Sequence, residues 1–238
     1  MMRREAAAAV ATRAANASSL HHLGRLASAT EALARGGRAR APLRGRHVAL
    51  LAAAHGDGPG DDGLDAIESA AAALGARTAR PSLGHPVSDG DVSMLAGLYQ
   101  LVCSDASLGK LSSRIRQLGV PVVDALLEPY HPVSLVALLL AVRDRVGDSA
   151  PVVLHCADPA HAAGAALAAE AAAVLRIPLR SGIAAPSHAW RLVTAPGGYG
   201  AWQLEPPAGL ECDRTDWGRT LERMRELALQ AALLQAVT

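Results

Sequence analysis

An acidic glycine loop occupies a position where parallel sheets commonly bind anions. The apolar run Arg46–Ala54 leads into a loop that contains Asp57, Asp61 and Asp62, and an alanine-rich segment with helical spacing follows. A strand, a glycine loop and a helix in this order usually bind phosphate, because backbone N–H groups at the helix N-terminus point at the ligand. This loop has three carboxylates and no Lys or Arg. The pattern therefore predicts the architecture of a phosphate site with the charge of a cation site.

Other polar side chains follow the later predicted strands. In an open parallel sheet the ligand lies at the carboxyl ends of the strands, so these side chains are expected to share one edge. Those expected to do proton chemistry are Asp61, Asp62 and His131, and those expected to contact the ligand are His55, Asp57, Ser104, Asp105 and Tyr130. Glu128, His155 and Cys156 complete the set at the strand ends.

Three interpretations of these residues stay open from the sequence alone. In the first, His131 or an aspartate accepts a proton from a substrate ammonium group. In the second, His and Asp bind a metal, but the chain has no HxH or HExxH spacing, so we predict neither a metal nor another cofactor. In the third, the aspartates are turn and helix-cap residues, which Gly-rich and Asp-rich loops favour in any case.

The elements that position these residues alternate between strands and helices. Strands are predicted over 48–54, 76–82, 99–104 and 120–126, and helices over 64–74, from 89 or 91 onward, over 108–118 and over about 132–146. A helix is also predicted over 20–36. Four strand–helix alternations predict a parallel sheet with helices on both faces.

A second and shorter α/β set follows a predicted hinge at Arg145–Pro151. Its elements are a strand over 151–156, a helix over 160–175, a strand over 178–183, a hairpin around Gly197–Gly198 and an amphipathic helix over 215–237. We predict a flexible basic arm over 1–19, a first lobe over 20–147 and a reduced second lobe over 148–238. The last helix is expected to pack back on the first lobe.

Composition narrows the classes of partner. Half of the residues are apolar and the net charge is +1, which is typical of an ordinary globular chain. The first 46 residues hold nine Arg and two Glu, but no aromatic residues interleave with the arginines, so we predict no nucleic-acid partner. Three widely spaced cysteines indicate reduced thiols and a cytoplasmic protein. No apolar run is long enough to predict a membrane span or membrane partner.

Several segments together resemble the aspartate/ornithine carbamoyltransferases. Val120–Pro132, "VPVVDALLEPYHP", is similar to their V-P-V-I-N-x-L strand followed by H-P-x-x-Q at the start of a long helix. Leu43–Leu51 is similar to their L-K-G-K strand, Ile67–Arg77 to their F-E-x-A-A-x-x-L-G-G helix, and His85–Val102 to their E-P-I-x-D-T loop and helix. Val152–Pro186 resembles the first βαβ unit of their amino-acid-binding lobe more faintly.

The resemblance covers about residues 20–186 and 213–237, and it implies a two-lobed α/β fold. It also implies that the S-T-R-T-R motif, which binds carbamoyl phosphate in the family, falls on Gly60–Leu64. The two arginines of that motif become Asp62 and Leu64. A unit charge pair at about 4 Å is worth about 4 kcal/mol at an effective dielectric constant near 20, and here its sign is reversed. We therefore expect the fold to be kept and the carbamoyl phosphate site to be lost.

Other departures from the family point the same way. The strand-end arginine falls near Ser104 and Asp105, and the glutamine of H-P-x-x-Q is Leu135. The H-C-L-P and S-M-G segments of the family have no counterpart, and the second lobe is shorter than is usual. His131 is the family site residue that is retained.

These observations lead to an expected function and two alternatives. The expected function is a component of an enzyme of amino-acid-derived secondary metabolism that acts on an amine nucleophile, for example by intramolecular ring closure to an aziridine in antibiotic biosynthesis. The expected ligand is a small amine or an amino-acid derivative. The first alternative is a non-catalytic pseudoenzyme that assembles with a related subunit in a homo- or hetero-oligomer. The second is a genuine amino-acid carbamoyltransferase, which the reversed charge disfavours.

Overall fold

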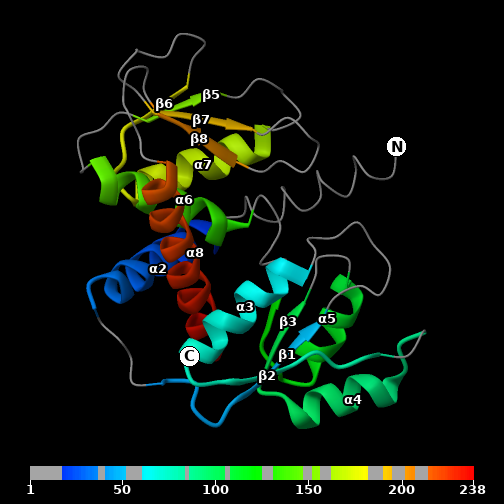
Figure 1. Cartoon of the computed structure of the whole chain (residues 1–238). Helices are drawn as coiled ribbons and strands as arrows, with labels where there is room; N and C mark the ends of the chain where they lie inside the picture. The colour runs from blue at the N-terminus through cyan, green and yellow to red at the C-terminus, as the bar shows by residue number, and fades with distance from the viewer. Residues whose placement is uncertain are drawn as a thin grey trace. The chain divides into compact units, whose positions relative to one another are not determined.

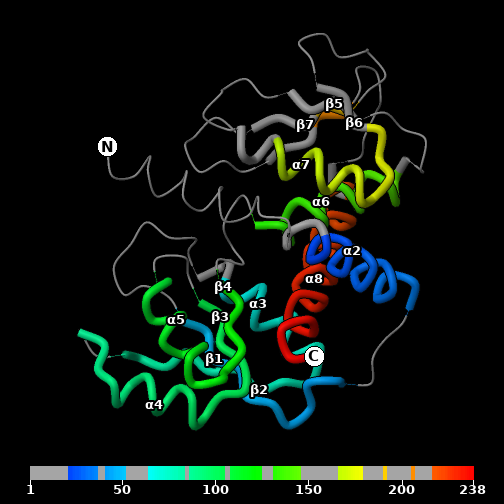
Figure 2. Tube along the Cα trace, turned by 180° about the vertical axis from the view of Figure 1, so that it is seen from behind, coloured from blue at the N-terminus to red at the C-terminus, as the bar shows by residue number. Residues whose placement is uncertain are grey.

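The computed structural model divides into two compact units, each built around one sheet (Figures 1 and 2). The first-sheet unit comprises Thr30–Glu128 and Leu229–Thr238, and the second-sheet unit comprises Met1–Ala29 and Pro129–Ala228. The structure describes residues 18–36, 41–51, 61–83, 86–104, 108–124, 131–146, 152–155, 162–181, 190–194, 202–206 and 214–238. The two units are considered separately below.

Four parallel strands form the first sheet, as the strand–helix alternation predicts. In chain order the elements are β1 (His47–Leu51), α3 (Asp61–Ala73), β2 (Arg77–Ala79), α4 (Asp89–Leu98), β3 (Leu101–Ser104), α5 (Gly109–Gln117) and β4 (Val122–Asp124). The strand order is β2-β1-β3-β4, and every neighbouring pair is parallel. Leu51, Ser104 and Asp124 are aligned across the strands, so β1, β3 and β4 end at the same edge.

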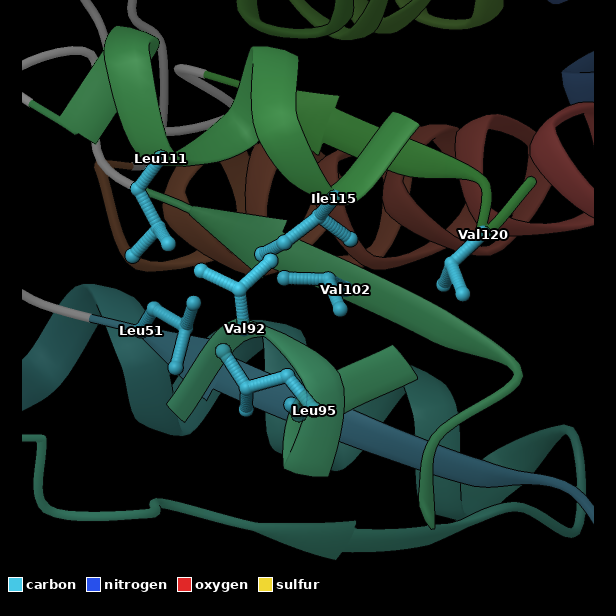
Figure 3. Packing of buried hydrophobic residues seen from close by; sticks show 8 residues of the cluster. Leu51, Val92, Leu95, Val102, Leu111, Ile115 and Val120 are labelled. Carbon is cyan, nitrogen blue, oxygen red and sulfur yellow. The ribbon is translucent and has the colours of Figure 1, made fainter. Parts of the chain in front are cut away.

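One face of this sheet is covered by α4 and α5. Side chains alternate between the two faces along a strand, and Ala49 and Leu51 of β1 and Val102 of β3 point to the same face. They pack against buried residues of the two helices and the following loop (Figure 3), namely Val92, Leu95, Leu111, Ile115 and Val120. This packing fixes α5 over β3, which matters for the polar groups described below.

The other face is covered by α3, which lies on the opposite side of the sheet from α5 (Figures 1 and 2). Its buried residues recur at helical spacing and form one apolar stripe, made up of Ile67, Ala70, Ala71 and Leu74. The helix ends at Ala73, and Gly75 in the turn that follows has a positive φ of 84°, which suits glycine. Because both faces are covered, all residues of β1 from Val48 to Leu51 are buried.

The second sheet is parallel except for one edge strand. Its elements are β5 (Val152–His155), α7 (Ala162–Val174), β6 (Leu179–Ser181), β7 (Trp190–Thr194) and β8 (Trp202–Glu205), and the strand order is β6-β5-β7-β8. β5 runs parallel to β6 and β7, whereas β7 and β8 are antiparallel. This pairing confirms that the two strands of the predicted hairpin are antiparallel, whereas Gly197 and Gly198 lie outside the described residues. Trp190 is buried, and its ring centroid lies 5.4 Å from that of Trp217.

The remaining described elements are three long helices, α2 (Ser18–Ala34), α6 (Pro132–Val146) and α8 (Arg214–Val237). α6 has the predicted bounds and is buried on nearly all sides, which fits its continuous apolar sequence. In the second-sheet unit, Arg143 of α6 donates to the carbonyl oxygen of Leu175 at 3.4 Å, and Arg145 forms an ion pair with Asp216 of α8.

The division into units differs from the predicted lobe borders. It places α6 with the second sheet, whereas the sequence assigned residues up to 147 to the first lobe. It also places the last ten residues, Leu229–Thr238, with the first sheet. Residues 1–17 of the predicted arm and 147–151 of the predicted hinge lie outside the described residues, and Ser18 and Ser19 are already helical.

We expect Ser88→Ala to lower the free energy of unfolding by about 1 kcal/mol, because Ser88 is the N-cap of α4. Its Oγ accepts from the backbone N–H of Asp91 at 3.1 Å, and the Asp91 carboxylate accepts from the backbone N–H of Ser88 at 2.8 Å. The Ser88 hydroxyl also donates to the Asp91 carboxylate at 2.7 Å, and this bond, together with the bond from the Ser88 backbone N–H, lowers the pKa of Asp91.

The stabilisation that the Asp91 carboxylate provides is therefore present at neutral pH and is lost as the pH falls through the lowered pKa of Asp91. Urea unfolding followed by circular dichroism at pH 7 and pH 3 measures both effects. A Ser88→Ala variant as stable as the unsubstituted chain at both pH values would contradict the capping assignment.

Candidate functional site at the carboxyl edge of the first sheet

Polar residues end two neighbouring strands at the carboxyl edge of the first sheet, and others begin the helix that follows β1. Ser104 ends β3, Asp124 ends β4, and the two residues are paired in register. α3 follows β1 along the chain, and Asp61 and Asp62 are its first two residues. Ser104 and Asp124 thus lie at the edge where ligands of an open parallel sheet bind.

A chain of hydrogen bonds joins β3, β4 and α5 at this edge. The Ser104 hydroxyl donates to Oδ1 of Asp124 at 2.6 Å, and its Oγ lies 2.7 Å from Oγ of Ser112 on α5. A serine hydroxyl has a single hydrogen to donate, and a carboxylate has none. Since Ser104 gives its hydrogen to Asp124, Ser112 must be the donor in the serine pair.

An ion pair completes this chain. Arg116 lies one helical turn after Ser112, and its guanidinium pairs with Oδ2 of Asp124 and donates to the carbonyl oxygen of Val122 at 3.2 Å. Ser112 therefore donates to Ser104, and both Ser104 and Arg116 donate to the Asp124 carboxylate. We refer to these four residues as the Ser112–Arg116 network.

The network extends from the core to the surface. Ser112 is fully buried and Ser104 is 7% exposed, whereas the side chains of Asp124 and Arg116 are 29% and 45% exposed. The serine pair satisfies polar groups that burial would otherwise penalise, and the ion pair meets solvent. In this arrangement Ser104 has no hydrogen left for a ligand, and Asp124 is balanced by a cation.

Cys103, the neighbour of Ser104 in β3, is excluded as a nucleophile by its surroundings. Burial raises the pKa of the Cys103 thiol to about 12, and the negative charge of Asp124 adds to the effect. The thiolate is the reactive form of cysteine, so Cys103 stays protonated and unreactive at physiological pH. Its role is that of a small apolar side chain in the core.

We expect Cys103 to resist alkylation by iodoacetamide in the native protein and to react after unfolding in urea. The measurement is mass spectrometry of the Cys103 peptide at pH 8, before and after denaturation. Labelling of native Cys103 at the rate of an unfolded thiol would contradict its burial. A Cys103→Ser variant, which lacks this thiol, identifies the labelled peptide.

A second ion-pair group secures α3 against β2. Glu68, the glutamate of the segment similar to the family's F-E helix, accepts from Thr78 at 2.9 Å and from Arg80 at 2.8 Å. Arg80 also pairs with Asp65, and its hydrogen bonds to Asp65 and Glu68 raise the pKa of its guanidinium. Arg80, which follows β2, is therefore engaged by α3 residues.

His131 lies in the second-sheet unit, immediately before α6. Its Nδ1 accepts from the backbone N–H of Val133 at 3.2 Å, so the ring caps the helix. When Nδ1 accepts, the ring is neutral and carries its hydrogen on Nε2. The predicted role of His131 as a proton acceptor stays a prediction.

The described residues account for part of the predicted site. Asp61 and Asp62 start α3, and Ser104 belongs to the Ser112–Arg116 network. His131 belongs to the other unit, so its convergence with the aspartates stays a prediction. His155 ends β5. The remaining predicted residues, which are His55, Asp57, Asp105, Glu128, Tyr130 and Cys156, lie outside the described residues.

Sequence reasoning missed Ser112, Arg116 and Asp124. Asp124 stands at the carboxyl end of a predicted strand, so the criterion that selected Ser104 applied to it as well. Ser112 and Arg116 are four residues apart on a predicted helix and therefore share a face. The sequence does not reveal which face of α5 meets the end of β3, and that rotation creates the network.

The described residues were also compared with the requirements of a metal site and of a membrane-spanning helix. Among the described residues, no group of three or more His, Cys, Asp or Glu is placed to hold a metal ion. Within those same ranges, no helix combines the length and the hydropathy needed to cross a membrane.

Comparisons with known proteins identify the fold. No protein-family model matches the sequence, and no curated protein sequence matches it. Solved structures do match. Ornithine carbamoyltransferase from Thermus thermophilus aligns with a TM-score of 0.59 at 15% identity, over 92% of this chain and 96% of that chain. Anabolic ornithine carbamoyltransferase from Campylobacter jejuni aligns with a TM-score of 0.58 at 12% identity, over 91% and 95% of the chains.

Aspartate transcarbamoylase from Trypanosoma cruzi aligns with a TM-score of 0.51 at 12% identity, over 90% of this chain and 91% of that chain. Identities this low establish a likeness of fold, and function has to be argued from the site. The chain has the carbamoyltransferase fold, an α/β architecture with a four-stranded parallel sheet and flanking helices. This finding confirms the fold predicted from the sequence motifs.

Proposed function

We propose that this protein binds a cationic amine on the carbamoyltransferase fold and does not use carbamoyl phosphate. The observation that carries the proposal is the start of α3. Asp61 and Asp62 occupy the first turn of the helix that follows the first strand, where the family resemblance places a phosphate-binding arginine motif. A phosphate dianion there faces like charges, each worth about 4 kcal/mol at 4 Å and an effective dielectric constant near 20.

The same carboxylates suit an ammonium group. A charge-assisted hydrogen bond between an ammonium and a carboxylate is stronger than a neutral one. The described cations near strand ends add support, because Arg116 is paired with Asp124 and Arg80 with Asp65 and Glu68. A diamino acid such as L-ornithine is therefore the ligand class that fits this edge.

The proposed reaction is a displacement by the amine nitrogen within an amino-acid-derived substrate. The nitrogen forms a bond to a carbon that bears a leaving group, the bond from that carbon to the leaving group breaks, and the leaving group departs with the electron pair. The carboxylate of Asp61 or Asp62 takes the proton that the nitrogen releases. A three-membered nitrogen ring is one such product, and the protein acts as a component of secondary-metabolite biosynthesis.

Isothermal titration calorimetry of the full chain tests the binding half of this proposal. The titrants are L-ornithine, norvaline and carbamoyl phosphate, where norvaline is the matched control that lacks the side-chain ammonium of ornithine. We expect ornithine to bind and the other two not to bind. If carbamoyl phosphate binds and ornithine does not, the proposal is wrong. If ornithine and norvaline bind equally, the side-chain ammonium does not contribute to binding.

A second candidate function, a subunit that assembles with another copy or a related chain, is supported by exposed apolar residues. Met94 and Leu98 are one helical turn apart on α4 and are 38% and 54% exposed, and Leu118 after α5 is 54% exposed. Size-exclusion chromatography with light scattering tests it. A measured mass above that of the 24.4 kDa monomer supports assembly, and a lower mass for a Leu98→Ser variant would assign the assembly to this surface. A protein that is monomeric at micromolar concentration contradicts self-assembly.

A further inference from the structure

The Asp124–Arg116 ion pair joins two groups of opposite charge at the edge where a ligand of the first sheet would bind. Both side chains are partly exposed, at 29% and 45%, so either partner is accessible to a ligand once the other is removed. Asp124 is fixed by the end of β4 and by the Ser104 hydroxyl at 2.6 Å. Arg116 is held by Asp124 and by the carbonyl oxygen of Val122 at 3.2 Å.

We propose, on the basis of the amine-binding function above, that the Asp124–Arg116 pair determines the sign of the charge that this edge accepts. Asp124 keeps the Arg116 guanidinium from binding anions, and Arg116 keeps the Asp124 carboxylate from binding amines. The pair thus balances both charges at the ends of β3 and β4. Asp124 and Arg116 are specificity-determining residues in this account, and they need not touch the reacting atoms.

The Ser112–Arg116 network makes this charge balance testable with small changes. Asp124→Asn keeps an oxygen that accepts from Ser104 and replaces the oxygen facing Arg116 with an N–H donor. Two donors facing each other do not pair, so the guanidinium is released. Arg116→Gln has the opposite effect and leaves the Asp124 carboxylate without its cation.

Asp89→Asn provides a matched control. Asp89 pairs with Arg114, which also lies on α5, and its side chain is 99% exposed. The substitution changes the net charge by the same amount as Asp124→Asn and also releases an α5 arginine. It involves no strand end, so general electrostatic effects appear equally in both variants.

The test is calorimetric titration of the full chain and its variants with inorganic phosphate and, separately, with L-ornithine. We expect the phosphate association constant of Asp124→Asn to exceed that of Asp89→Asn by about tenfold or more, as for one charge-assisted hydrogen bond. The gain should disappear in the Arg116→Gln/Asp124→Asn double variant. Arg116→Gln should bind L-ornithine about tenfold more tightly than the unsubstituted chain.

Equal phosphate binding by Asp124→Asn and Asp89→Asn would overturn this inference, as would a gain that persists in the double variant. If no variant binds ornithine but the phosphate gain occurs and depends on Arg116, the amine function fails and the role of the pair in excluding anions stands. Circular dichroism verifies that each variant is folded. Asp124→Ser, which also keeps an acceptor for Ser104, replaces Asp124→Asn if that variant is unfolded.

Discussion

Replacing Asp61 and Asp62 together by asparagine is expected to weaken L-ornithine binding by about 100-fold or more. Each carboxylate offers a charge-assisted hydrogen bond to an ammonium group, and such bonds contribute about 1.5 to 3 kcal/mol each. Two of them correspond to at least two orders of magnitude in the dissociation constant. Calorimetric titration of the variant and the unsubstituted chain at low ionic strength measures the loss.

The matched control for this prediction lies one turn further along the same helix. Asp65→Asn with Glu68→Gln removes two carboxylates from α3 and changes the net charge equally, but these groups pair with Arg80. Ion pairs at exposed positions contribute little to stability, so the control should remain folded. An equal loss of ornithine binding in both double variants would show that total charge, and not the start of α3, controls the affinity.

Leu95→Ala is expected to lower the free energy of unfolding by about 3 kcal/mol, the typical cost of a cavity left by a buried leucine. Leu95 is fully buried and belongs to the cluster that joins α4 and α5 to β1 and β3 (Figure 3). Urea unfolding followed by circular dichroism measures the change. Because this cluster positions α5, the variant should also reduce the protection of the Ser112 amide in hydrogen exchange.

Met94→Ala, at the neighbouring position, is the control for Leu95→Ala. Met94 is 38% exposed, and substitutions at exposed positions usually change stability by less than about 0.5 kcal/mol. If the two variants lose similar stability, α4 does not pack against the sheet as described. The comparison thus tests the orientation of α4 as well as the burial of one residue.

The sequence predicted the sheet best where both faces are buried. Residues 48–54 contain no polar residue, which is typical of a central parallel strand, and the structure places β1 (His47–Leu51) there. The apolar sequence of α6 predicted its bounds to the residue. In both cases burial on all sides leaves few alternatives for the chain, so pattern and structure agree.

Boundaries with little burial were predicted less well. The helix predicted over 64–74 starts earlier in the structure, where α3 begins at Asp61. Asp and Gly have low helix propensity, yet a carboxylate in the first turn interacts favourably with the helix dipole. β2 is shorter than the predicted strand, with three residues at the edge of the sheet. The ends of helices and strands depend on local interactions more than on the spacing of apolar residues.

The position of Ser104 at the end of a strand was predictable from the sequence, and its hydrogen-bond partners were not. The rule that ligands lie at strand ends selected Ser104, which the structure places at the carboxyl edge of β3. It did not reveal that Ser104 gives its hydrogen to Asp124, because that contact depends on the register between β3 and β4. Likewise, Ser112 reaches Ser104 because apolar residues such as Ile115 fix the rotation of α5.

The central claim is that this carbamoyltransferase fold accepts an amine where the family motif accepts a phosphate donor. The most direct measurement is a crystal structure after soaking with equal concentrations of carbamoyl phosphate and L-ornithine. We predict density for ornithine with its side-chain ammonium within hydrogen-bond distance of Asp61 or Asp62, and none for carbamoyl phosphate at the start of α3. Carbamoyl phosphate bound at the N-terminus of α3, with ornithine absent there, would contradict the account.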